Sequence, residues 1–250
     1  MKSKLKKAAI LIAALVFWIG VWYLAAKMIG KSLILPTPEK VFLRLWELMG
    51  TASFYEILLF SLLRVILGFA ISLFLGFFLG VLSFHLSPVR ALVSPMMAIV
   101  RATPVASFIL IILFWMKTQW VPAFTSFLMV LPIVWQNVLL GLEKRDGQIL
   151  EMAKAFSLSP RTRFWKIDLP HLLSYVASAG KTGLGLAWKA GVAAEVLALS
   201  QKSIGYMIYN AKMYLEEVDL YAWTVAIILI SVILEKIFSF LFFGRRRKNA

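Results

Sequence analysis

Residues 151–170 of the chain read EMAKAFSLSPRTRFWKIDLP, a polar and basic stretch set between two long apolar runs. The hydrocarbon core of a bilayer offers no hydrogen-bond partner to irregular backbone, so a segment of this kind must lie in water or inside protein. If the flanking runs cross a membrane, the stretch is a solvent-facing loop. Loops of such length that carry a helical pattern of their own are usually functional.

The composition of the whole chain is that of an integral membrane protein. Hydrophobic residues make up 61% and charged residues 16%, against about 45–50% and about 25% in soluble domains. The mean hydropathy is +0.85. A soluble fold could not hide so much apolar surface, so we expect an all-α membrane protein.

The net charge of +15 has two readings, nucleic-acid binding and membrane orientation. The basic residues cluster in 2–7, 143–166 and 244–248, each beside an apolar run. This pattern is typical of cytoplasmic segments under the positive-inside rule, and we therefore expect no nucleic-acid partner. The sequence contains no cysteine, which excludes disulfides and thiolate metal sites.

Apolar runs separated by polar turns predict six transmembrane helices in a single domain covering residues 1–250. A basic segment at each terminus requires an even number of crossings, with the N- and C-termini both cytoplasmic. The loop 143–171 then lies on the cytoplasmic side as well. The first run is longer than a secretory signal and is expected to remain uncleaved. The predicted spans cover residues 8–26, 57–84, 91–116, 121–142, 172–199 and 220–243.

Proline, glycine and threonine give local predictions between and within these spans. Thr37 and the proline after it predict the start of an amphipathic helix on the outer side, either interfacial or a plain connector. Gly76 and Gly80 form a small-xxx-small pair that permits close helix contact. Pro95 and Pro104 are expected to interrupt the third span.

The polar loop itself predicts two short helices. Apolar residues at helical spacing favour the first helix, over residues 148–157. Ser159 and the following proline predict the start of a second helix, and Pro170 predicts a break before the fifth span. Such a helix–turn–helix at the inner membrane surface is suited to docking a cytoplasmic partner, although a solvated connector fits the same pattern. The apolar stripe of the first helix consists of Ile149, Ala153 and Phe156.

This loop resembles the EAA loop of binding-protein-dependent ABC importer permeases. In that motif a Glu-Ala-Ala triplet precedes a glycine and, after a spacer, the sequence Ile-x-Leu-Pro. Met152 replaces the middle alanine here, and Ser157 stands where the motif has its glycine. The residues that match are Glu151, Ala153, Ile167, Leu169 and Pro170.

The resemblance extends along nearly the whole chain, in the style of the nitrate, sulfonate and taurine branch of these permeases. The motif pieces outside the loop are weak when taken singly. They are residues 35–38 (LPTP), Ser61, Arg64, Gly68, Gly76, Gly80, Arg101, Pro104 and the run 180–195 with Trp188 and Glu195.

The family resemblance implies a type I importer fold in a bacterial or archaeal plasma membrane, and a set of partners. These are a second copy of the permease, two cytoplasmic ATPases, an external solute-binding protein and the surrounding lipid. The EAA loop would couple the permease to the ATPases through Glu151, Ala153, Ser157 and the Ile-x-Leu-Pro segment. ATP and Mg would be bound by the ATPase, so no cofactor is expected in this chain and no enzymatic activity of its own.

Charged residues inside predicted spans are costly and are default candidates for function. Arg101, Lys189 and Glu195, together with Trp188, are the candidates for the translocation pathway. Lys189 and Glu195 are six residues apart, so they do not share one helical face. Each could instead form a structural ion pair between helices. The surplus of positive charge at depth predicts an anionic or polar organic solute such as a sulfonate, taurine or nitrate.

Two other classes of function compete with an ATP-driven permease. An ATP-independent channel or ion-coupled transporter could use Arg101, Lys189 and Glu195 as a charge relay, but it would not need the docking loop. A membrane-embedded hydrolase usually shows a motif such as H-E-x-x-H. The two histidines, His85 and His171, are in no such motif. The sequence also lacks the phosphate-binding loop G-x-x-x-x-G-K-[ST].

Overall fold

The structure is a computed structural model that describes residues 2–243, without the side chains of residues 2–5, 7, 8, 11 and 243. All regular secondary structure in this described part is helical. The elements are α1 Lys2–Ile29, α2 Pro38–Met49, α3 Ala52–His85, α4 Ser87–Ala102, α5 Val105–Ile112, the 3₁₀ turn η1 Thr118–Trp120, α6 Val121–Glu143, α7 Gly147–Ala155, α8 Pro160–Arg163, the π-helical turn η2 Phe164–Asp168, α9 Leu169–Ala198, α10 Ile204–Met213 and α11 Glu217–Phe243.

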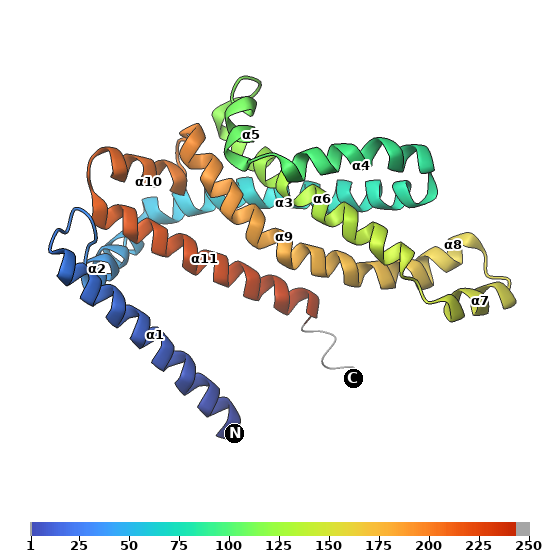
Figure 1. Cartoon of the computed structure of the whole chain (residues 1–250), viewed down its shortest axis with the longest axis horizontal. Coiled ribbons are helices and arrows are strands. Elements are labelled where there is room, and N and C mark those ends of the chain that lie inside the picture. The colour runs from blue at the N-terminus through green and yellow to red at the C-terminus, as the bar shows by residue number, and fades with distance from the viewer. Residues whose placement is uncertain (1, 244–250) are drawn as a thin grey trace.

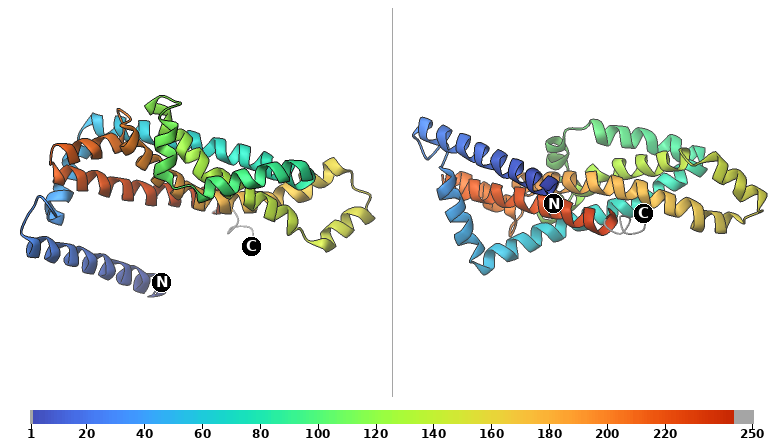
Figure 2. Two further views of the ribbon diagram at one scale, coloured as in Figure 1. Left: turned by 45° about the horizontal axis from the view of Figure 1, so that its top comes forward. Right: turned by 90° about the horizontal axis from the view of Figure 1, so that it is seen from below.

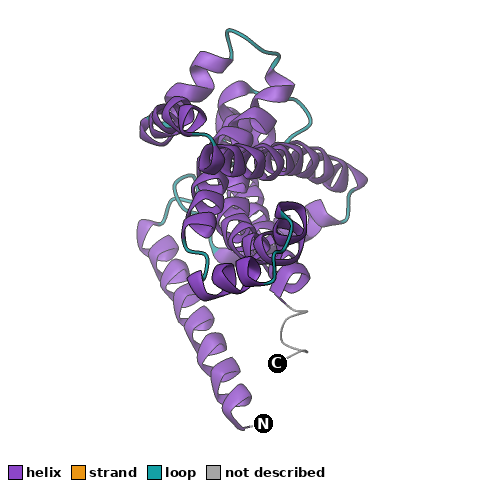
Figure 3. Cartoon of the chain, turned by 90° about the vertical axis from the view of Figure 1, so that its right-hand side faces the viewer, coloured by secondary structure: helices purple, strands orange, loops and turns teal. Residues whose placement is uncertain are grey.

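The long helices run roughly lengthwise in an elongated bundle (Figure 1). Helices α7 and α8 form one end of the molecule, and α2 and α10 lie at the other end. Helix α1 diverges from the bundle, and Figures 2 and 3 show it standing apart in other orientations. Only 6% of its apolar stretch is buried. The basic run 244–248 lies outside the described residues.

Glycines on α3 allow this helix to contact α6 closely along most of its length. A Cβ added to Gly68 would lie 2.0 Å from the carbonyl oxygen of Ala123. Added at Gly76 or Gly80, it would lie 2.7 Å from the Cβ of a valine on α6. Between these contacts the hydroxyl of Ser72 donates a 2.7 Å hydrogen bond to a carbonyl of α6. The predicted small-residue contact is therefore confirmed.

Helix α9 completes the centre of the bundle by packing against both α6 and α3. Gly183 and Gly191 bring its backbone close to Val130 of α6 and Val65 of α3. On another side Trp188 is fully buried, and its indole Nε1 donates a 3.1 Å hydrogen bond to a carbonyl of α11. Helix α9 therefore contacts α11 as well as the central helices α3 and α6.

The predicted third span is broken into two helices. Helix α4 ends at Ala102 and α5 begins at Val105, and the two axes differ by 105°. The residue before Pro104, Thr103, adopts an extended conformation with φ −78° and ψ 129°, as steric conflict with the proline ring favours. Pro95, in contrast, lies inside α4 without ending it. The predicted interruption of residues 91–116 is thus confirmed at Pro104, and the one predicted at Pro95 is wrong.

Among the described residues four helices are long and apolar enough to cross a bilayer, or five if the bent α4–α5 pair counts as one span. They are α1, α3, α6 with the turn before it, and α11. Helix α9 has 30 residues, about 45 Å at 1.5 Å per residue, so its length is sufficient. Its lower apolar content reflects glycines, alanines and charged residues, many of which face other helices.

The predicted amphipathic helix is present as α2, and it packs on α11. Val41 and Leu45 of its apolar face are buried. On the other face Arg44 pairs with Asp219 of α11, and its Nη2 lies 3.0 Å from the carboxylate. The hydrogen bonds that Arg44 donates to the carboxylates of Asp219 and Glu47 raise its pKa above the ordinary value.

The cap expected at the start of α2 is only partly realised. Thr37 occupies the N-cap position with a proline after it, but its hydroxyl makes no bond to a backbone N–H. Instead it donates to a carboxylate oxygen of Glu39 at 3.2 Å. The prediction that the side chain of Thr37 caps the helix is therefore wrong.

Candidate functional site

The polar loop begins with a capped helix at the end of the molecule. Asp146 is the N-cap of α7, and its carboxylate accepts a 2.9 Å hydrogen bond from the backbone of Gln148. This bond satisfies one of the free N–H groups of the first turn. The helix covers Gly147–Ala155, so the predicted helix over residues 148–157 is confirmed with ends shifted by one or two residues.

Ser157 adopts the left-handed conformation that favours glycine, with φ +50°. The backbone of Ser157 donates to Lys154, and that of Leu158 donates to Ala153 at 3.0 Å. These two bonds define a Schellman motif, in which the residue after the C-cap is usually glycine because a Cβ is strained there. Ser157, which stands at the glycine position of the motif, thus forms this left-handed turn, and its Cβ makes the conformation less favourable by about 1 kcal/mol.

The second half of the loop is a continuous helix rather than a helix followed by a break. As predicted, Ser159 is the N-cap and Pro160 is the first residue of α8. The backbone then passes through the π-helical turn η2 directly into α9, whose first turn contains Pro170. A π turn shifts hydrogen bonding from i−4 to i−5 and so accommodates a residue without an N–H. The predicted break at Pro170 is therefore wrong.

A buried ion pair at the base of the loop was not predicted. Asp168 is buried, and its carboxylate lies 3.0 Å from Arg145 and 3.5 Å from Arg163. Arg145 also donates to the carbonyl of Leu142 at the end of α6. These contacts connect both ends of the loop to each other. Arg145 and Asp168 are 23 positions apart, and no local pattern in the sequence indicates that two such residues form an ion pair.

The apolar stripe predicted on α7 is mostly exposed. Ala153 is buried within the loop, but Ile149 is 41% and Phe156 is 74% exposed. Met152 and Trp165 add exposures of 49% and 60%. We call Ile149, Met152, Phe156 and Trp165 the loop face. Glu151 is also exposed. Large apolar side chains exposed on a polar segment are typical of an interaction surface.

The rest of the motif connects this surface to the core of the bundle. Ile167 and Leu169 are partly buried, and Pro170 is exposed. They belong to the uninterrupted helical path from Pro160 to Ala198. A displacement of the loop would therefore be transmitted along α9 without an intervening flexible linker.

The structure does not bring the four candidate pathway residues together. Arg101 at the end of α4 is exposed and donates a hydrogen bond to the side chain of Gln136. Trp188 is packed in the core against α11. Lys189 is exposed, whereas Glu195 is fully buried on a different side of α9. As expected from their spacing, Lys189 and Glu195 do not share a face.

Glu195 is the centre of a buried polar cluster that joins α3, α9 and α10. One carboxylate oxygen accepts hydrogen bonds from Ser61 at 2.9 Å and from the backbone of Gly205 at 3.1 Å. The other oxygen lies 3.8 Å from a guanidinium nitrogen of Arg64. Gly205 is required for this approach, because an added Cβ would lie 2.4 Å from that of Glu195.

Lys189 belongs to a second, open cluster on α9. It lines a cavity of about 480 Å³ with Lys181, Thr182 and Gly185, and with Glu235 of α11. Glu235 reaches close to the α9 backbone, since a Cβ on Gly185 would lie 2.8 Å from its carboxylate oxygen. Both lysines and Glu235 are exposed on the surface of this single chain. Glu235 lies within a predicted span and was missed, although an acidic residue there is itself a signal.

Comparison with known proteins gives a family and several relatives. Residues 72–246 match the family described as binding-protein-dependent transport system inner membrane component. The chain is 24% identical to the taurine transport system permease protein TauC of Escherichia coli K12, over 86% of this chain and 80% of the relative.

Two further relatives carry other substrate names. The putative aliphatic sulfonates transport permease protein SsuC of Escherichia coli K12 is 28% identical, over 79% of this chain and 76% of its own length. The formylaminopyrimidine transport permease protein ThiX of Halalkalibacterium halodurans is 24% identical, over 74% of each chain.

Proposed function

Because this chain belongs to the family of binding-protein-dependent transport system inner membrane components, we propose that it forms the translocation pathway of an ATP-driven solute importer. As a permease of this family it is a multi-pass protein of the plasma membrane. In the proposed assembly two permease chains face each other, two cytoplasmic ATPases bind and hydrolyse ATP with Mg, and an external binding protein delivers the solute.

The proposed topology has six crossings with both termini in the cytoplasm. The crossings are α1, α3, the α4–α5 pair, α6, α9 and α11. The basic segments at both ends of the sequence support an even number. In this arrangement the α7–α8 loop faces the cytoplasm, and α2 and α10 lie at the outer surface.

The loop face is the observation that carries the ATPase-coupling role. Its four large apolar side chains are exposed, and they lie on or beside the short helix α7. This helix follows its N-cap Asp146 and ends in the left-handed turn at Ser157. The ion pair of Asp168 fixes the base of this loop. A rigid, apolar projection is suited to insertion into a groove of the ATPase. Movement of that ATPase would then shift α9 between two arrangements of the pathway.

The coupling role predicts that charge reversal at Glu151 or loss of the Phe156 ring weakens the complex with the ATPase. We expect Glu151→Arg and Phe156→Ser each to reduce the ATPase that co-purifies from native membranes about tenfold or more, because Phe156 belongs to the loop face and Glu151 is exposed on the same helix, α7. A matched control is Glu216→Arg, which reverses an exposed charge near the outer surface. Wild-type amounts of coupled ATPase in both loop variants would contradict the proposed coupling.

The open cluster on α9 supports an anionic solute, or one with an anionic group such as a sulfonate. Two lysines and one carboxylate leave an excess of positive charge around the cavity. Two permease chains facing each other through α9 would double that excess. The substrate names of the relatives TauC and SsuC agree with this chemistry, whereas that of ThiX leaves polar heterocyclic solutes as the second class.

The anionic pathway predicts that Lys189→Met impairs transport without impairing assembly. Uptake of the anionic solute should fall about tenfold, because a fixed positive charge is removed where little water screens it. ATPase co-purification should stay at the wild-type level. Lys40→Met, on the exposed face of α2, removes the same charge outside the pathway and is the control. Normal uptake by the Lys189 variant would refute this role.

A further inference from the structure

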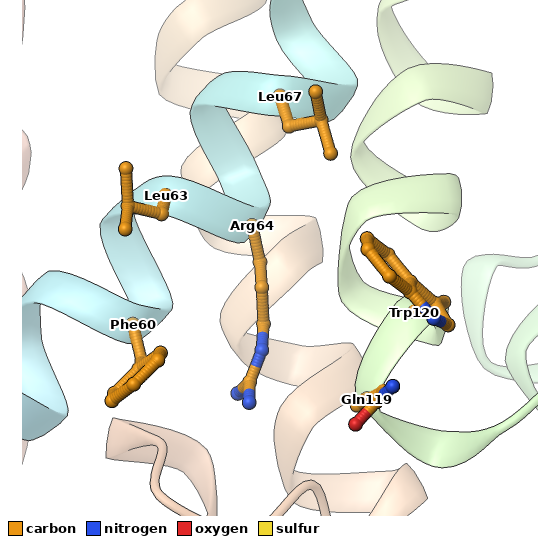
Figure 4. A pocket seen from close by; sticks show the side chains of 6 residues that line it. All are labelled: Phe60, Leu63, Arg64, Leu67, Gln119 and Trp120. Carbon is orange, nitrogen blue, oxygen red and sulfur yellow. The ribbon is translucent and has the colours of Figure 1, made fainter.

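A groove with one polar and one apolar half runs between α3 and the start of α6. It consists of two adjoining cavities of about 330 Å³ and about 430 Å³, which share Leu67 and Trp120 as walls. The first cavity is lined by Arg64 and Gln119 among apolar residues, and Figure 4 shows the guanidinium of Arg64 extending into the space between Phe60 and Gln119. The second is lined entirely by apolar side chains, including Ile71 and Leu75.

The polar half of the groove is basic. One guanidinium nitrogen of Arg64 donates a 3.1 Å hydrogen bond to the backbone carbonyl of Gln201. Its pair with Glu195 lies on the buried side. Lys117 is exposed two residues before Gln119, and the ammonium of Lys202 lies 5.8 Å from the ring centroid of Phe60. The one exposed carboxylate in contact with this group is Glu56, which pairs with Lys202 at 2.8 Å.

The polar half lies near the outer boundary of the predicted hydrocarbon layer, with Arg64 about two turns inside the predicted span 57–84. Gln201 follows the outer end of α9, and Trp120 immediately precedes α6, as befits an aromatic residue at a membrane interface. The apolar half then runs inward along α3. Eleven residues separate Arg64 from Leu75, about 16 Å at 1.5 Å per residue. This length matches one leaflet of a hydrocarbon core about 30 Å thick.

We propose that this groove holds one anionic phospholipid of the outer leaflet. The phosphate would bind at Arg64 and Gln119, because a guanidinium offers several donors to phosphate oxygens. One acyl chain would lie along Leu67, Ile71 and Leu75. The position of the groove in the membrane, its length along α3 and its positive charge all fit this occupant.

The other candidate occupant, helix α1 of a second copy, does not match the charge. The sequence of α1 contains several lysines and no acidic residue. Arg64 faces Glu195 and Lys202 faces Glu56, so α1 placed in the groove would leave the positive charge of Lys117 at the polar end without a counter-charge. A phosphate supplies that counter-charge together with an apolar chain, so the lipid accounts for both halves of the groove.

The test measures lipid retention by the purified full-length protein, with its associated subunits, using native mass spectrometry. Phosphatidylglycerol is compared with phosphatidylcholine, and glycerol 3-phosphate represents the headgroup without chains. We expect wild type to retain phosphatidylglycerol at least tenfold more tightly than the other two. Leu67→Trp should fill the shared wall and weaken this retention about tenfold, while Arg64 and Glu195 stay in place.

The control variant is Leu82→Trp, which should retain the lipid as wild type does. Leu82 is 45% exposed against 44% for Leu67, lies on the same helix and lines neither cavity. Undiminished retention in Leu67→Trp, equal retention of phosphatidylcholine, or equal binding of glycerol 3-phosphate would each overturn the proposal. So would a crosslink between Leu67→Cys and Trp18→Cys of a second copy, which the absence of native cysteine makes unambiguous.

Discussion

Gly68→Ala is expected to destabilise the protein by about 3 kcal/mol, although alanine is the better helix former by about 1 kcal/mol. The new Cβ would lie 2.0 Å from the carbonyl oxygen of Ala123, where ordinary contact begins at 3.4 Å. Backbone cannot rotate aside as a side chain can, so α3 and α6 must separate. That separation would also stretch the bond from Ser72 to α6 and loosen the valine contacts further along.

The measurement is the thermal unfolding midpoint of the purified protein in detergent, which we expect to fall by roughly 6–12 °C. Gly20→Ala is the matched control, since an added Cβ at this position of α1 meets nothing within 4 Å. It should leave the midpoint unchanged or slightly higher. An unchanged midpoint for Gly68→Ala would mean that α3 and α6 do not approach as closely as described here.

Glu195→Leu is the second change with a large expected effect, a loss of about 3–5 kcal/mol. Leucine has a similar volume but accepts no hydrogen bond. The hydroxyl of Ser61 and the N–H of Gly205 would lose their acceptor, and Arg64 would lose its only nearby buried counter-charge among the described residues. Because these groups lie on α3 and α10, the outer end of α9 would be detached from both.

Glu195→Gln separates hydrogen bonding from charge in this cluster. The amide oxygen can still accept from Ser61 and Gly205, so we expect a loss of only about 1–2 kcal/mol. Unfolding midpoints of the two variants give the comparison, and intact uptake by Glu195→Gln would agree with a structural role. Glu195→Leu as stable as wild type would contradict the buried cluster. Uptake abolished by Glu195→Gln at an unchanged midpoint would instead indicate a role in the pathway.

Ser157 illustrates how a motif can be kept in geometry while it is lost in sequence. The expected glycine is absent, yet the backbone takes the left-handed conformation and makes both bonds of the Schellman turn. The signals around it are local, namely an apolar run before the turn and Ser-Pro after it. Local signals of this kind were sufficient to predict α7, the start of α8 and the glycine contacts of α3.

Signals that depend on two distant segments were not available before folding. Asp168 pairs with Arg145, and Glu235 contacts α9. The periodicity of apolar residues along the chain does not indicate that these segments lie close together in the fold. The same holds for Glu195, which looked equivalent to Lys189 as a charge within a span. Packing places Glu195 in the interior against α3 and α10, and leaves Lys189 open.

The sequence by itself determined that this protein is an all-helical membrane protein that resembles a permease, and it predicted the short helices of the loop at residues 151–170. These conclusions rest on composition, on the placement of basic residues and on the spacing of prolines, serines and apolar residues. Such features act within a few turns of one helix, so their effect does not depend on tertiary contacts. Only the tertiary structure decided which charges are buried, that α4 and α5 bend apart by as much as 105°, and that the loop continues into α9. Those outcomes depend on which helices meet and at what distance, because burial determines whether a charge needs a partner.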